Sequence, residues 1–308
     1  MIDVILCCYN QSKYIEKALQ GICKQKVNEK INLIVADDCS PDDTLEKIRK
    51  YTLPDFIQIN ILPNKKNLGF IKNYQRAFMA CSSKYIFIIE GDDYWTSEDH
   101  ISNHIHFLEE HSEVSMTMNR LTILNNESHE ISYSYWEENW HGHKLWFLEE
   151  QIFANRLGNL SACCFRGDLI AKLPKRLFNL YFADWLLGMI MCESGPLAIL
   201  EKSTSVYRVH PNGQWSRMTL DEQNNELFRL GNIYDKYFGY KYTNEFNSLR
   251  NRLGFSIKEK YNLKIKNLLK KAILFFYLRR RKILFCLFIL FLIFLIFISP
   301  EQIFTKGV

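Results

Sequence analysis

The chain has 308 residues, of which 47% are hydrophobic, 14% are aromatic and only seven are proline, so it can bury a substantial core. This composition excludes a disordered, low-complexity or collagen-like protein. The net charge is +5, but residues 258–282 alone carry +9, which leaves −4 for the rest of the chain. An acidic body binds phosphate backbones poorly, so we expect no nucleic acid partner.

Short β-branched runs alternate with amphipathic stretches from residue 3 onwards, a pattern typical of a βαβ series. The predicted strands are Val4–Cys8, Ile31–Ala36, Ile57–Leu62 and Tyr85–Ile89, and the helices between them are Lys13–Lys26, Thr44–Tyr51 and Ile71–Cys81. These elements predict an α/β fold with a parallel, doubly wound sheet and right-handed crossovers. Ligands of such sheets bind at the carboxyl ends of the strands.

Polar side chains follow three of the four strands at these ends. They are Tyr9 and Asn10 after the first strand, Asp37 and Asp38 after the second, and Glu90, Gly91, Asp92 and Asp93 after the fourth. Carboxylates at this density suit Mg²⁺ or Mn²⁺, which accept phosphate oxygens as further ligands. An acidic turn that caps the next predicted helix, Ser97–Glu110, is an equal alternative. The sequence contains neither GxGxxG nor GxxxxGK[ST], which disfavours a dinucleotide oxidoreductase and a P-loop nucleotidase.

Other features point away from a secreted or zinc-binding protein. The N-terminus lacks the basic and apolar regions of a signal peptide, so we expect the main domain in the cytosol. The nine cysteines form no CxxC motif and are expected to be buried free thiols. His100 and His104 lie four residues apart, but no cysteine or carboxylate completes a zinc set at typical spacing.

Near the C-terminus the chain becomes basic and then apolar. Ile283–Ile298 contains no polar side chain except one cysteine. As a helix it would measure roughly 24 Å, slightly less than a hydrocarbon core of about 30 Å. The preceding Arg279–Lys282 cluster favours the cytoplasmic side and contact with anionic lipid. A buried core helix is the alternative, and whether the segment spans the membrane or is only embedded stays open.

Several motifs, in order and spacing, resemble those of family 2 glycosyltransferases. They are VILCCYNQSKYIEKALQGICKQ at the start, VADDCSPDDT at 35–44, NLGFIKN at 67–73, IIEGDDYW at 88–95, FADWLLGMI at 182–190 and YRVHPNGQWS at 207–216. The resemblance covers roughly residues 2–216 and implies the GT-A fold, a Rossmann-like, mostly parallel sheet flanked by helices. It also implies transfer of a sugar from a nucleoside diphosphate donor to an acceptor hydroxyl, with inversion.

The resemblance implies roles for individual residues. Nucleotide-binding roles fall on Tyr9, Asn10, Asp37, Asp38, Asn67, Gly69, Asn73, Glu90, Gly91 and Asp92. Asp38 would accept the imide N–H of a uracil or thymine base, which favours a UDP or dTDP donor. Asp92, Asp93 and His210 would hold the Mn²⁺ or Mg²⁺ that bridges the phosphates. Glu90 stands where relatives often carry aspartate, and a hydrogen bond to the ribose is its alternative role.

Asp184 matches the catalytic base of the family, just before a predicted helix at Trp185–Cys192. An in-line displacement needs one carboxylate on the acceptor side to take the proton of the incoming hydroxyl. An N-cap of that helix is the alternative, and both roles are compatible. The remaining implied residues are Asn159 and Ser161 on the acceptor side, and Arg208 and Trp215 in a closing loop.

These inferences predict three parts: a GT-A catalytic domain at 1–220, a helical basic extension at 221–271 and a membrane-associating segment at 272–308. We expect the protein at the cytoplasmic face of the inner membrane, with a lipid-linked or saccharide acceptor such as a lipopolysaccharide or capsule precursor. One alternative is a non-catalytic, membrane-bound scaffold that binds nucleotide sugars. The other is a sugar nucleotidyltransferase, although the glycine-rich basic N-terminal loop usual for that class is absent.

Overall fold

The computed structural model describes residues 1–134, 141–181, 184–211, 213 and 215–254. Met1–Leu249 form one compact unit. The second unit, Arg250–Val308, is described only as far as residue 254. The site residues predicted from the sequence all belong to the first unit.

Every strand and helix predicted for the first half is present, with boundaries that differ by a few residues at most. The elements are β1 (Ile2–Cys8), α1 (Ile15–Cys23), β2 (Ile31–Asp37), α2 (Thr44–Lys50), β3 (Ile57–Ile61), α3 (Phe70–Met79) and β4 (Tyr85–Glu90). β3, β2, β1 and β4 lie in that order and run parallel. One face of β1 packs with α1 in the main core, and Cys7 on the other face lies near Tyr74 of α3. Helices therefore cover both faces, as a doubly wound sheet requires.

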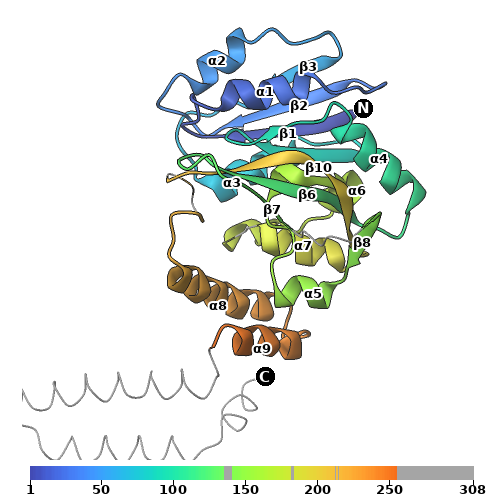
Figure 1. The fold of residues 1–308 in the computed structure, drawn as a ribbon, viewed down its shortest axis with the longest axis vertical. Coiled ribbons are helices and arrows are strands. Elements are labelled where there is room, and N and C mark those ends of the chain that lie inside the picture. Colours follow the sequence, from blue (N-terminus) through green and yellow to red (C-terminus); the bar gives the residue numbers. More distant parts are fainter. Residues whose placement is uncertain (135–140, 182–183, 212, 214, 255–308) are drawn as a thin grey trace, which may run out of the picture. The chain divides into compact units, whose positions relative to one another are not determined.

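The second half changes the character of the sheet. Its elements are β5 (Tyr94–Trp95), α4 (His100–Glu110), β6 (Met116–Asn125), β7 (Ile131–Tyr133), β8 (His143–Trp146), α5 (Leu148–Phe153), η1 (Leu160–Ala162), β9 (Cys163–Arg166), α6 (Gly167–Ala171), η2 (Lys175–Asn179), α7 (Asp184–Cys192) and β10 (Leu197–Val209). The full order is β3-β2-β1-β4-β9-β6-β10-β5, with β7 and β8 paired to β6 and β10 (Figure 1). β9 is antiparallel to both β4 and β6. The prediction of a mostly parallel sheet is therefore wrong for this half, because side-chain patterns identify a strand but not its direction.

Two helices, α8 (Leu220–Tyr237) and α9 (Thr243–Arg252), follow the sheet within the predicted helical extension. α8 begins with a capping box in which Thr219 and Glu222 satisfy each other's backbone N–H groups. In the part of the chain that the structure describes, no helix is long and apolar enough to cross a membrane. The predicted membrane-associating segment, 272–308, lies outside the described residues, so its role stays a prediction.

Candidate active site

The carboxyl ends of β1 and β2 are joined by a chain of hydrogen bonds. The backbone N–H of Asn10 donates to Ser40 Oγ over 3.0 Å, and the backbone N–H of Ser40 donates to Asp37 Oδ2 over 3.0 Å. Asn10 is in the left-handed region, with φ of 57°. This conformation turns the chain sharply after β1. It leaves Tyr9 exposed at the sheet edge formed by the carboxyl ends of β1, β2 and β4, which we call the donor rim.

Asp38, directly after β2, holds the loop that precedes α3. Its carboxylate accepts hydrogen bonds from the backbone N–H groups of Leu68 and Gly69, at 2.8 and 2.9 Å, and from Asn64 Nδ2 at 3.0 Å. Gly69 also donates to Asn67 Oδ1 over 2.9 Å and adopts a φ of 80°, where glycine is strongly favoured. The structure thus brings Asp38, Asn67 and Gly69 together. The predicted contact of Asp38 with a base stays a prediction, since three protein donors already share this carboxylate.

Asn73, on the first turns of α3, points under the end of β2. Its Nδ2 donates to the carbonyl of Ala36 over 2.6 Å, and its Oδ1 accepts from Arg76 Nε over 2.8 Å. Arg76 also donates from Nη2 to the carbonyl of Asp37 over 2.6 Å. The buried side chain of Asn73 therefore stabilises the end of β2, and its predicted contact with a nucleotide stays a prediction.

The EGDD turn after β4 begins with a buried glutamate. Tyr74 Oη donates to Glu90 Oε1 over 2.9 Å. Burial, followed by the charges of Asp93 and Asp92, raises the pKa of Glu90 well above its usual value, which favours the neutral acid. A Cβ on the next residue, Gly91, would overlap Gln11 Oε1 and come within 3.0 Å of Cys8 Cβ and Ile15 Cδ1, so a larger residue here would require the Gln11 side chain to move.

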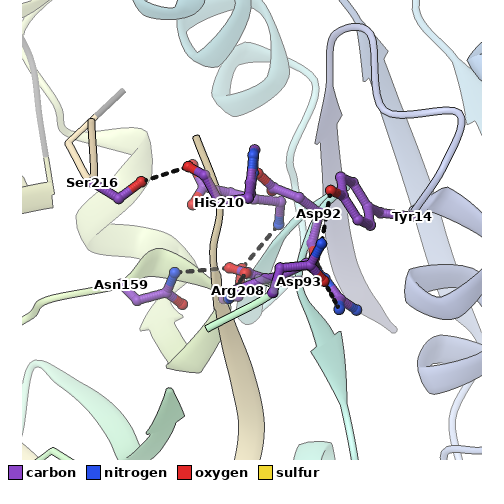
Figure 2. A network of polar contacts seen from close by, with 10 residues as sticks. Tyr14, Asp92, Asp93, Asn159, Arg208, His210 and Ser216 are labelled. Carbon is purple, nitrogen blue, oxygen red and sulfur yellow. Dashed lines mark hydrogen bonds and ion pairs between the residues drawn. The ribbon is translucent and has the colours of Figure 1, made fainter. Parts of the chain in front are cut away.

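Asp93 lies at the centre of a polar network that joins three segments of the chain (Figure 2). Its Oδ2 accepts from Asn159 Nδ2 at 2.8 Å and Ser161 Oγ at 2.7 Å, and its Oδ1 accepts from the backbone N–H of Arg208 at 2.9 Å. Burial, with a further contribution from the charge of Asp92, raises the pKa of Asp93 to about 7. The predicted acceptor-side residues Asn159 and Ser161 are thus buried partners of Asp93.

The 207–216 motif reaches the same turn through two side chains. His210 Nε2 lies 3.0 Å from Asp92 Oδ2, and Ser216 Oγ donates to the carbonyl of His210 over 2.9 Å (Figure 2). Arg208 Nε donates to the backbone carbonyl of Asp92 over 2.8 Å, and its guanidinium carbon lies 5.0 Å from the centroid of the Tyr14 ring. Arg208 is therefore held against the EGDD turn.

A cation at this rim would find an incomplete set of protein ligands. Among the described residues, no group of three or more His, Cys, Asp or Glu side chains is arranged to hold a metal. Asp92 and His210 offer two adjacent donors, and His210 Nδ1 is buried without a partner. Both carboxylate oxygens of Asp93 already accept hydrogen bonds. One carboxylate and one imidazole would suit Mn²⁺ better than Mg²⁺, which prefers oxygen ligands, and either ion would take its remaining ligands from phosphate and water.

A cavity of about 550 Å³ opens beside the Asp92–His210 pair. Asn10, Lys13, Tyr14, Asn126 and His210 are among the residues that line it. The cavity is thus bordered by the start of α1, the turn after β6 and the end of β10. This location, at the carboxyl ends of central strands, is where α/β sheets bind ligands.

Asp184 comes from a different element, as the first residue of α7. Its Oδ1 accepts from the backbone N–H of Trp185 at 2.8 Å, and its Oδ2 accepts from Asn155 Nδ2 at 3.0 Å. Burial raises the pKa of Asp184, and these two hydrogen bonds lower it. The carboxylate therefore occupies a partly buried position that favours proton uptake.

A family model described as glycosyl transferase family 2 matches residues 3–167, more than half of the chain. The chain belongs to glycosyl transferase family 2.

The relatives of this family 2 glycosyltransferase include an uncharacterized protein from Mycobacterium tuberculosis, 24% identical over 222 residues. The match covers 72% of this chain and 62% of that protein, so it spans less than two thirds of the relative. Another is UDP-Glc:α-D-GlcNAc-diphosphoundecaprenol β-1,3-glucosyltransferase from Escherichia coli, 30% identical over 109 residues, covering 35% of this chain and 41% of the relative. The crystal structure of S. aureus TarS 1-349 with UDP-GlcNAc matches with a TM-score of 0.61 and 18% identity, covering 88% of this chain and 80% of the TarS 1-349 fragment. This likeness confirms the GT-A-like fold.

The sequence motifs of the glycosyltransferase did not reveal several residues that hold the site together. These are Tyr14, Tyr74, Arg76, Asn126 and Asn155. The sequence weakly indicated a role for Tyr74 and Arg76 in the site, because they follow Asn73 on the same predicted helix. Asn126 and Asn155 lie in connections between elements, where spacing gives no indication of a partner. Of the predicted residues, Tyr9 and Trp215 are exposed, and their binding roles stay predictions.

Proposed function

We propose that this enzyme transfers a sugar from a UDP or dTDP donor to a hydroxyl group of a lipid-linked glycan, such as a lipopolysaccharide or capsule precursor. One observation carries the proposal: a rim of strand-end carboxylates beside a cavity, with a separate, partly buried aspartate at the start of α7. A sugar transferase needs acidic groups beside the donor diphosphate and another carboxylate beside the acceptor hydroxyl, whose proton it takes.

The donor side comprises the ends of β1, β2 and β4. Asp38 and the ordered loop at Gly69 would receive the base and ribose, and Asp92 with His210 would face the diphosphate. These two residues would hold a divalent cation, which supplies neutralising charge to the leaving diphosphate when bound. The S. aureus TarS fragment with a similar fold is described in complex with UDP-GlcNAc, which supports a UDP-sugar as donor.

On the acceptor side, Asp184 acts as the general base. The acceptor oxygen forms a bond to the anomeric carbon while the bond from that carbon to the diphosphate oxygen breaks. The diphosphate keeps the electron pair, and the hydroxyl proton passes to the Asp184 carboxylate. A single displacement of this kind inverts the configuration at the anomeric carbon.

The membrane location is proposed from the C-terminal sequence. The basic stretch 258–282 and the apolar run that follows would hold the enzyme at the cytoplasmic membrane face, where a polyprenyl-linked acceptor lies. The E. coli relative is described as acting on a GlcNAc-diphosphoundecaprenol, which supports an acceptor of this class.

Three experiments test the proposal. A thermal-shift panel of UDP-, dTDP- and GDP-sugars, with and without Mn²⁺, should show stabilisation by a uridine or thymidine donor. The absence of a thermal shift with every uridine and thymidine donor would contradict the assignment. Incubation with a membrane lipid extract should release nucleoside diphosphate, whereas pyrophosphate release would favour a nucleotidyltransferase. A non-catalytic scaffold predicts that Asp184→Asn leaves function in cells intact, and we expect that variant to lose it.

A further inference from the structure

The side chain of Asn155 contacts the carboxylate to which the proposed function assigns proton abstraction. Asn155 follows α5, and its Nδ2 donates to Asp184 Oδ2 over 3.0 Å. The other oxygen of the carboxylate accepts only the backbone N–H of Trp185, at 2.8 Å. Asn155 therefore supplies the one side-chain hydrogen bond that the described residues give to Asp184.

The orientation of the Asn155 amide is fixed by its other end. Asn155 Oδ1 accepts from the backbone N–H of Leu157 at 3.2 Å and lies 3.4 Å from Gln151 Nε2, which donates to it. These contacts require the oxygen on that side, so the NH₂ group must face Asp184. An amide held in this way contributes a hydrogen bond with little loss of side-chain entropy.

The segment that carries Asn155 is itself anchored on α7. Gln151 is fully buried, and its backbone carbonyl accepts from Trp185 Nε1 over 2.6 Å. Gln151 Oε1 accepts from the backbone N–H of Arg156 over 3.1 Å. A Cβ on Gly188 of α7 would overlap Gln151 Nε2, so the two segments approach closely. Asn155 and Asp184 are thus held by the same packed unit.

The electrostatic surroundings of Asp184 give this contact its importance. The titratable groups near it are Glu90 on β4, Cys163 on β9, Tyr207 on β10 and Tyr234 on α8. Burial raises the pKa of each of these groups, which favours their neutral forms. Within the described residues, no Lys, Arg or His forms an ion pair with Asp184. Hydrogen bonds, and not cations, therefore stabilise its charged form.

We propose that Asn155 is a positioning residue, which holds Asp184 in its proton-accepting orientation and keeps it ionised at neutral pH. The inference rests on the proposed role of Asp184 as the base. Within the described residues, the side chain of Asn155 forms hydrogen bonds with Gln151, Leu157 and Asp184 and with none of the donor-side residues, so its loss should affect the chemical step and leave donor binding unchanged.

The test compares Asn155→Ala and Asn155→Asp with the wild-type chain and with Asn225→Ala, an exposed asparagine on α8 that bonds only within its own helix. UDP release from UDP-GlcNAc or UDP-glucose is followed from pH 5 to 9 in the presence of a membrane lipid extract. Asn155→Ala should shift the acidic limb of the kcat profile upward by about one pH unit, since one charge-stabilising donor is lost. Asn155→Asp should shift it further, because two carboxyl groups would share one proton.

The outcomes separate this inference from the proposed function. We expect an unchanged donor KM in both variants and a wild-type profile for Asn225→Ala. A profile of Asn155→Ala that superimposes on wild type would overturn the positioning role. Should Asn155→Ala not fold, the profile of the nearly isosteric Asn155→Asp decides the question. If Asp184→Asn remains active, the base assignment itself fails; if it is inactive while the Asn155 profiles are unmoved, only the role of Asn155 is wrong.

Discussion

Two buried histidines on α4 should make the fold sensitive to acid. His100 and His104 are fully buried, and their Nδ1 atoms lie 2.8 Å from the hydroxyl oxygens of Thr204 and Thr117. Burial lowers the pKa of His100 well below its usual value and that of His104 to about 3. The structural consequence is a pair of imidazoles that remain neutral in the folded protein.

A lower pH should destabilise the folded protein, because burial lowers the pKa of both histidines. The pKa in the folded state lies below that in the unfolded state, about 6.5, so the unfolded chain takes up protons first as the pH falls. The stabilising contribution is complete above about pH 6.5 and is lost progressively below it. Each group costs about 1.4 kcal/mol per pH unit, so the pair costs about 3 kcal/mol at pH 5.5. This is a substantial fraction of a typical free energy of unfolding.

Urea denaturation at pH 7.5 and 5.5 measures this loss. His104→Gln keeps a polar side chain that does not titrate, so its free energy of unfolding should fall by about 1.4 kcal/mol less than that of wild type between the two pH values. His106→Gln, on the exposed face of the same helix, should behave as wild type. Using the difference between variants cancels contributions from other groups, such as Asp93. An equal fall in wild type and His104→Gln would refute the reasoning.

Further predictions concern the donor rim. Gly91→Ala should weaken the donor-induced thermal shift, because its Cβ would force the Gln11 side chain to move and would come within 3.0 Å of Cys8 and Ile15; an unchanged shift would show that Gln11 moves without disturbing the turn. Asp38→Asn should destabilise the protein by about 1–3 kcal/mol, as measured by urea denaturation, since its amide would face the donors of the Gly69 loop. Cys39 is exposed next to Asp38, so UDP should slow its alkylation by iodoacetamide as followed by mass spectrometry; equal rates with and without UDP would place the nucleotide elsewhere.

The sequence by itself determined the first half of the fold. Alternation of apolar runs and amphipathic stretches is a local property, and it predicted the four parallel strands and three helices correctly. It also indicated that acidic residues end β2 and β4, which in a parallel sheet places them on one edge. The family motifs identified Asp184 and His210 as residues to examine, although spacing alone could not assign them a partner.

Only the tertiary structure decided how these residues meet. The antiparallel insertion of β9 between β4 and β6 brings Asn159 to Asp93, 66 residues away, and the end of β10 brings His210 to Asp92, 118 residues away. No local pattern encodes such pairings, because they depend on strand order and direction, which are set by the packing of the whole sheet. The same holds for Asn155 and Asp184, whose contact exists because α5 packs on α7.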